Sequence, residues 1–176
     1  MDGTVTIFDP HPEHPIAIAP PGIVFALTEL VECVCGLLAT EGAGPMCWCG
    51  MYPGASVSWE YCNECSGGMC GMGYVRLAGV FPYATFPLPV VDDRCVKPLG
   101  WAIEVGALRC LTIPEDGSIA SPAEMADVTI KQMLDATALY KAIRCCGLEI
   151  AVEAYRPTGP EGGCVGGFWL AYAAVN

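Results

Sequence analysis

Twelve cysteines in a chain of 176 residues constrain this sequence more than any other feature. Cysteine at this frequency is typical of a disulfide framework in an oxidising compartment, or of metal sites in a reducing one. We expect no signal peptide, because Asp2, Asp9 and Glu13 interrupt an N-terminal segment that lacks a basic and then an apolar stretch. The protein therefore either binds metal in the cytosol or reaches oxidising surroundings by a route other than secretion.

Disulfides are the simpler interpretation, because the number of cysteines is even and they cluster near the ends of the predicted elements. A bridge that closes a 15-residue loop contributes about 3 kcal/mol in the chain-entropy model. The sequence does not fix the pairing, and a cysteine inside an element, such as Cys33 or Cys110, is alternatively a small buried hydrophobic residue. The candidates are Cys33, Cys35, Cys47, Cys49, Cys62, Cys65, Cys70, Cys95, Cys110, Cys145, Cys146 and Cys164.

Zinc is the alternative for one group of these cysteines. A C-x-C pair followed by a C-x-x-C pair supplies four thiolates that can surround a zinc ion, here Cys47, Cys49, Cys62 and Cys65. Against this site, C-x-C is the poorer ligand spacing, Cys70 adds a fifth candidate, and no histidine lies nearby. We therefore expect no bound metal, and keep a cysteine-rich zinc-binding structural module as the alternative.

Charge and hydropathy argue against two classes of partner. The chain has 8 basic and 19 acidic residues, a net charge of −11, and no basic cluster that would grip a nucleic-acid backbone. Two prolines, Pro20 and Pro21, and then two glutamates, Glu29 and Glu32, interrupt the apolar segments near the N-terminus. We therefore expect no membrane-spanning segment and no membrane partner.

Residues that would support catalysis are sparse. A cysteine nucleophile requires a nearby base, and both histidines, His11 and His14, lie in the N-terminal segment. The glycine-rich stretches lack the strand-to-helix context of phosphate-binding motifs, and the carboxylates are scattered over predicted loops. We expect no catalytic residue, no cofactor and no enzymatic activity.

The helices carry the clearest local signals. Residues 1–21 are predicted to form an extended N-terminal arm, and residues 22–176 a single domain. A stripe of apolar residues with helical spacing follows Pro21 and ends before Gly42. The second helix begins with a capping box and a proline at its first position, from Ser121 to Glu124, and is expected to run to Cys146 and stop at Gly147. Its apolar positions, which are expected to pack on the sheet, include Ala126, Ile130, Met133, Leu134, Tyr140 and Ile143.

Five strands are expected, at residues 55–61, 74–81, 101–112, 148–156 and 168–175. The prolines that follow residue 81 argue against further pairing there, and residues 157–167 read as a flexible linker. The order is therefore helix, three strands, helix, two strands. This order predicts an α+β fold in which two helices pack on one face of a mainly antiparallel sheet.

These segments together resemble the cysteine-rich head-to-tail connector proteins of siphophages that infect actinobacteria, and the order of elements is similar to that of tail terminators. The resemblance covers residues 21–174, from PGIVFALTELVECVC through GYVRLAGVFPYATFP to GPEGGCVGGFW. The residues that best match the family are Phe81, Pro82, Phe86, Pro87, Cys95, Pro98, Glu104, Gly106, Arg109, Cys110, Cys145, Cys146, Gly163, Cys164, Gly166, Gly167 and Trp169.

The resemblance implies a structural virion protein, made in the host cytoplasm and located at the junction of tail and neck. Its partners would be copies of itself in a ring of six, the major tail tube protein and the head-to-tail stopper or neck protein, with DNA passing through the lumen. A domain of this length has a radius of gyration of about 16 Å, so six copies leave a hole on the order of 40 Å. A neck or head-completion ring is the alternative position.

The predicted N-terminal arm generates the first test. Extended segments close rings by pairing with an exposed sheet edge of a neighbour, and the segment around Ile16–Ala19 and the strand that ends at Val175 are the candidates here. Deletion of residues 1–20 should therefore weaken ring assembly, measured as a shift to smaller species in sedimentation velocity. Rings of unchanged stability would show that the arm has no part in assembly.

Overall fold

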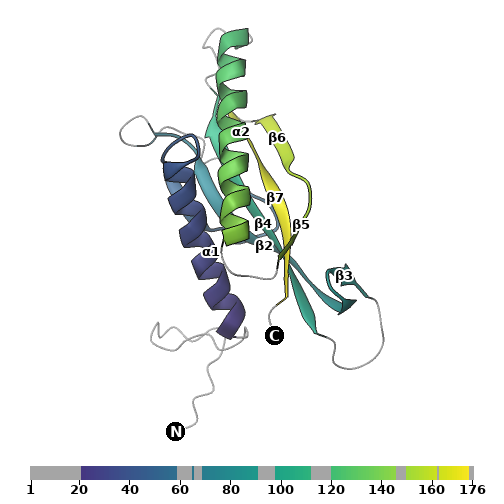
Figure 1. Ribbon diagram of the computed structural model, residues 1–176. Coiled ribbons are helices and arrows are strands. Elements are labelled where there is room, and N and C mark those ends of the chain that lie inside the picture. The colour runs from purple at the N-terminus through teal and green to yellow at the C-terminus, as the bar shows by residue number, and fades with distance from the viewer. Residues whose placement is uncertain are drawn as a thin grey trace.

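Two helices and a seven-stranded mixed sheet form an α+β fold (Figure 1). The computed structural model describes residues 21–58, 65, 69–90, 98–111, 120–145, 150–161 and 163–174. Residues 1–20 of the predicted arm lie outside them. The elements are α1 (Pro21–Thr40), β1 (Trp48–Met51), β2 (Met72–Thr85), β3 (Leu88–Pro89), β4 (Leu99–Cys110), α2 (Pro122–Cys145), β5 (Ile150–Val152), β6 (Arg156–Glu161) and β7 (Cys164–Ala174).

Helix α1 forms where the apolar stripe predicted it. Its fully buried side chains, Ile23, Leu30, Val34 and Leu38, recur at helical spacing and pack toward the sheet and α2. The amides of residues 41 and 42 both bond to the carbonyl of Leu37, which satisfies a backbone acceptor at the end of the helix.

Helix α2 begins with the predicted capping box. The amide of Glu124 donates to the Ser121 hydroxyl over 3.3 Å, and the amide of Ser121 donates to the Glu124 carboxylate over 2.7 Å. The buried face differs from the expected one. Ile130 and Met133, expected to pack inside, are 58% and 66% exposed, and the face turned to the core consists of Val128, Asp135, Ala138, Leu139, Ala142 and Ile143.

Strand β4 is the central strand. The sheet has the order β1-β2-β4-β7-β5, with β3 beside β2 and β6 beside β7. Every pair is antiparallel except β1 with β2, which run parallel. Val75, Val105 and Ala171 project from three neighbouring strands into the core beneath the helices.

The number and order of the strands differ from the prediction. The structure has one helix, four strands, a second helix and three strands. Residues 55–58 of the first expected strand are not a strand, and β1 lies before them instead. Strand β2 continues through Pro82, because this residue needs no ladder donor and its carbonyl accepts from the amide of Val90. The strand expected at residues 148–156 is divided into β5 and β6, and residues 157–161 of the expected linker form most of β6.

The layout also differs from the predicted one, in which two helices pack on one face of the sheet. Helices α1 and α2 pack against each other as well as against the strands. The far end of β2 and β4, together with β3, extends past the helical layer (Figure 1). This end of the sheet therefore projects from the domain.

Disulfide bonds join cysteines that are 14 to 40 residues apart in the sequence. Cys35–Cys49 ties α1 to β1, Cys47–Cys65 ties the start of β1 to the following segment, and Cys70–Cys110 joins the segment before β2 to the end of β4. Their Cα–Cα distances are 5.7, 5.8 and 5.8 Å. Cys110 is therefore a bridge partner rather than a free buried residue. Cys164 is also disulfide-bonded, Cys33 and Cys145 are free, and Cys62, Cys95 and Cys146 lie outside the described residues.

One helix among the described residues is a candidate membrane span by length and composition only. Residues Gly22–Thr40 of α1 are long and apolar enough to cross a bilayer, in spite of Glu29 and Glu32. The core helix of a soluble protein passes the same test, and 28% of this window is buried inside the structure. The helix by itself is weak evidence for a membrane location.

The Cys35–Cys49 bridge should contribute strongly to stability. It closes a loop with a sequence separation of 14, so its removal in a Cys35→Ala, Cys49→Ala variant should lower the free energy of unfolding by about 3 kcal/mol. Urea denaturation measures this loss. The matched control is Cys33→Ala, which removes a free thiol from the same helix and should cost much less; equal losses would contradict a role for the bridge.

Candidate functional site

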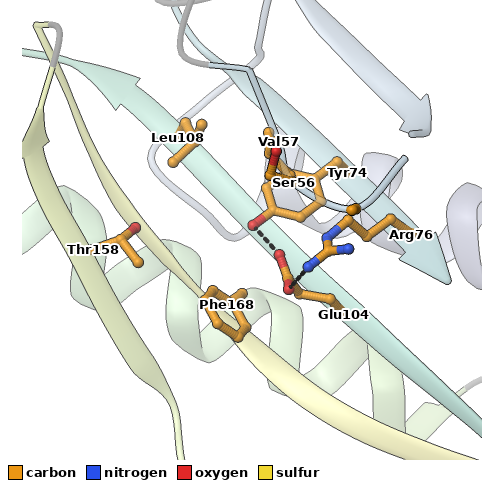
Figure 2. Close-up of a pocket in the computed structure, with 9 residues that line it drawn as sticks. Ser56, Val57, Tyr74, Arg76, Glu104, Leu108, Thr158 and Phe168 are labelled. Carbon is orange, nitrogen blue, oxygen red and sulfur yellow. Dashed lines mark hydrogen bonds and ion pairs between the residues drawn. The ribbon is translucent and has the colours of Figure 1, made fainter. Parts of the chain in front are cut away.

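A polar cluster lies on the sheet face opposite the helices, at the centre of the molecule (Figure 2). Tyr74 and Arg76 alternate on β2 and so share this face, and Glu104 stands opposite Arg76 on β4. The Tyr74 hydroxyl donates to Glu104 Oε1 over 2.8 Å, and Arg76 Nη2 donates to Glu104 Oε2 over 2.6 Å. One carboxylate therefore connects two side chains of the neighbouring strand.

A glycine makes room for the tyrosine ring. Gly106 is the cross-strand partner of Tyr74, and a β-carbon at Gly106 would overlap the ring. Gly100 and Phe81 repeat this arrangement farther along the same two strands. The aromatic rings of β2 therefore lie flat over glycines of β4, which closes gaps in the sheet surface.

A shallow cavity of about 230 Å³ adjoins the cluster. Residues 55–57, Leu108, Thr158 and Phe168 form its other walls (Figure 2). Arg76 Nη1 donates to the carbonyl of Gly54 over 3.3 Å, which holds the segment after β1 against the sheet. Within the described part of the chain, the Nε of Arg76 is buried without a hydrogen-bond partner.

The electrostatics of the cluster favour a structural role. Burial raises the pKa of Tyr74 well above its usual value, and the negative charge of Glu104 raises it further, so the phenol stays protonated at neutral pH. Each carboxylate oxygen of Glu104 accepts a hydrogen bond from a side chain of β2, which fixes the position of the carboxylate between the two strands. The cluster holds β2, β4 and the 52–58 segment together.

A second buried ion pair lies between β4 and α2. Arg109 Nε and Nη2 donate to the two carboxylate oxygens of Asp135 over 2.8 and 2.9 Å. Arg109 also donates to the carbonyls of Gly44 and Pro45, while the amide of Ala43 donates to Asp135. The pair thereby provides hydrogen-bond partners for backbone groups of the segment that follows α1.

The cysteines of the zinc alternative are engaged elsewhere. Cys47 and Cys49 lie in two different disulfides, Cys65 is the partner of Cys47, and Cys62 lies outside the described residues. Bridged sulfurs supply no thiolates for zinc. Among the residues that the structure describes, no group of three metal-ligating side chains occurs, and His11 and His14 are outside them.

The projecting end of the sheet is the candidate interaction surface. We call residues 77–89 together with residues 99–101 the uncharged hairpin, because these residues include no Asp, Glu, Lys or Arg. The sequence between the two parts does carry charges, at Asp92, Asp93, Arg94 and Lys97. Four of its large apolar side chains are exposed, namely Leu77, Val80, Leu88 and Leu99. Exposed apolar side chains that lie close together are a feature of sites that bind another macromolecule.

Sequence analysis found part of these features. The resemblance named Glu104, Gly106 and Arg109 as matching residues without assigning them contacts. Arg76 and Asp135 were missed, although a charged residue among buried apolar positions is itself a signal of a pair.

No protein-family model matches the chain, and no curated protein matches its sequence.

The Arg109–Asp135 pair should be costly to break. Arg109→Met leaves a buried carboxylate without its partner and should lower the free energy of unfolding by about 3–5 kcal/mol, measured in urea. The matched control is Lys131→Met, which breaks an exposed pair with Asp127 and should cost no more than about 1 kcal/mol. Similar losses in both variants would contradict a special role for the buried pair.

The raised pKa of Tyr74 predicts a loss of stability at alkaline pH. The phenol titrates near pH 10 in the unfolded chain and at higher pH when folded, so its contribution is complete below pH 10 and is lost as pH rises toward the folded value. Between these limits, each such phenol lowers the free energy of unfolding by about 1.4 kcal/mol per pH unit. Tyr74→Phe should make the free energy of unfolding fall less steeply with pH, by about 1.4 kcal/mol per pH unit, in urea denaturation above pH 10. An unchanged slope would contradict the raised pKa of Tyr74.

Proposed function

We propose that this chain is a structural protein of a tailed phage virion, a ring-forming tail terminator that joins the tail tube to the neck around the DNA channel. In this proposal it is not an enzyme, and it acts by contacting copies of itself, the major tail tube protein and the head-to-tail stopper. The proposal starts from the resemblance of residues 21–174 to siphophage connectors.

The observation that carries the proposal is the uncharged hairpin. A protein that works alone in water rarely exposes a long apolar segment without charges, because such segments aggregate. Interfaces between proteins, by contrast, are depleted of charge at their centre. The hairpin projects from the domain, where it can reach a neighbouring chain (Figure 1).

The disulfides support a location outside a reducing cytosol. The three described bridges join α1 to β1, Cys47 to Cys65, and the segment before β2 to β4, and Cys164 is also bridged. Such bonds persist in oxidising surroundings. A virion released by lysis provides them, and a bridged domain suits a particle that must hold its geometry after release.

The charges support passage of DNA without adhesion. The chain carries a net charge of −11, and a ring of six copies would carry six times as much. Most described basic side chains are in ion pairs with carboxylates, namely Arg76, Arg109, Lys131, Lys141 and Arg156. They offer little free positive charge to phosphates.

Electron microscopy and native mass spectrometry of the purified protein test the proposal. We expect closed rings of about six copies with an open axis, and binding to the tail tube protein of the same particle. Rings that bind only neck proteins would place the chain at the neck or head-completion position. A monomer at micromolar concentration would overturn the proposal.

A further inference from the structure

Three cysteines lie side by side across the middle of the sheet, near the end of β4. Cys110 of β4 is bonded to Cys70, just before β2, with a Cα–Cα distance of 5.8 Å. On its other side, Cys110 has Cys164 of β7 as its partner in the strand register. Partners in an antiparallel ladder project to the same face of the sheet. Cys110 therefore stands between two other cysteines.

The hydrogen-bond pattern brings Cys110 and Cys164 especially close. The amide of Leu111 donates to the carbonyl of Gly163 over 2.7 Å, so these two residues form a hydrogen-bonded pair one step farther along the ladder. The two kinds of pair alternate, and Cys110 with Cys164 is therefore a non-hydrogen-bonded pair. Cα atoms in such pairs lie about 4.5 Å apart, which is within the range that a disulfide spans.

The three sulfurs differ in their access to solvent. Cys70 and Cys110 are half-buried, and both line a shallow cavity of about 270 Å³. Cys164 is completely buried. A small thiol in solution can therefore reach the Cys70–Cys110 bond, whereas the sulfur of Cys164 is reached from Cys110.

Two disulfide bonds meet at this place, because Cys164 is itself disulfide-bonded. Thiol–disulfide exchange needs a thiolate beside a disulfide sulfur. A thiolate formed at Cys110 has the bonded sulfur of Cys164 as its cross-strand neighbour. The arrangement thus supplies an attacking group and its target within one ladder pair.

We propose that Cys70 is a site of attack by small thiol reductants, and that the attack moves the bond of Cys110 from Cys70 to Cys164. The reductant thiolate bonds to the Sγ of Cys70, and the electron pair of the broken S–S bond leaves on the Sγ of Cys110. This thiolate then bonds to the Sγ of Cys164 and displaces the cysteine that was bonded there, which takes up a proton.

A dithiol reductant completes the reaction. Its second thiol attacks the mixed disulfide, the reductant leaves as a cyclic disulfide, and Cys70 becomes a thiol. Two protein disulfides have then become one disulfide and two thiols, and the two hydrogens come from the dithiol. The balance requires no other reactant.

The exchange would release one segment and keep the sheet closed. Cys70 would no longer tie the segment before β2 to β4, while β4 and β7 would gain a covalent link beside their ladder. The Cys47–Cys65 bond would remain. This inference concerns a single chain, so it goes beyond the proposed ring and does not depend on it.

Limited reduction of the wild-type protein tests the exchange. The protein is treated with about one equivalent of dithiothreitol, its thiols are blocked with N-ethylmaleimide, and unreduced peptides are mapped by mass spectrometry. We expect label at Cys70 in at least about tenfold excess over Cys110, together with a peptide pair linked through Cys110 and Cys164. Equal labelling of Cys70 and Cys110, absence of the linked pair, or a Cys70 that stays unlabelled while other bonds are reduced would overturn the proposal.

A variant and an internal control separate exchange from simple exposure. Cys164→Ala removes the acceptor, so Cys70 and Cys110 should then be labelled equally; an excess at Cys70 that persists in this variant would overturn the exchange. The Cys35–Cys49 bond is the internal control, because the register partner of Cys49 is Gly73, and its two cysteines should be labelled equally. If Cys164→Ala does not fold, the linked peptide pair of the wild type decides the proposal.

Discussion

The buried pair of Arg109 and Asp135 is the interaction on which the arrangement of the layers depends. Strand β4 lies at the centre of the sheet and α2 lies above it, and the pair joins them through two hydrogen bonds. The remaining donors of the guanidinium, together with the carboxylate, satisfy the backbone that follows α1. Because both charges are out of water, each requires the other, so one geometry of helix, strand and loop is specified.

The other constraints act around this centre. The Tyr74–Glu104–Arg76 cluster holds the face that no helix covers, and the described disulfides fix α1, β1 and the segment before β2, which share few backbone ladders. Trp169 of β7 adds a further bond from its indole to the carbonyl of Ala136 on α2. The domain is thus held rigid by polar and covalent links while much apolar surface remains outside.

Prediction from the sequence succeeded where a local signal agreed with the tertiary structure. The capping box at Ser121 placed the start of α2 because it is formed by neighbouring residues. Strand β6 was missed because its composition, RPTGPE, is that of a loop; it pairs only with β7, and a strand at the edge of a sheet tolerates proline. The pairing of the cysteines could not be predicted, because it depends on distances that spacing along the chain does not report.

The error on α2 has the clearest physical meaning. Apolar periodicity assigned Ile130 and Met133 to the core, yet the helix turns them outward and buries Asp135, since Arg109 requires that carboxylate. Hydrophobicity in this chain therefore does not mark the inside alone. Exposed apolar side chains also lie on the first turns of α1 and on the uncharged hairpin. Two ion pairs, Arg76–Glu104 and Arg109–Asp135, are buried, while apolar side chains stay exposed at these separate places. Under the proposed function, these exposed apolar places are where neighbouring chains would make contact.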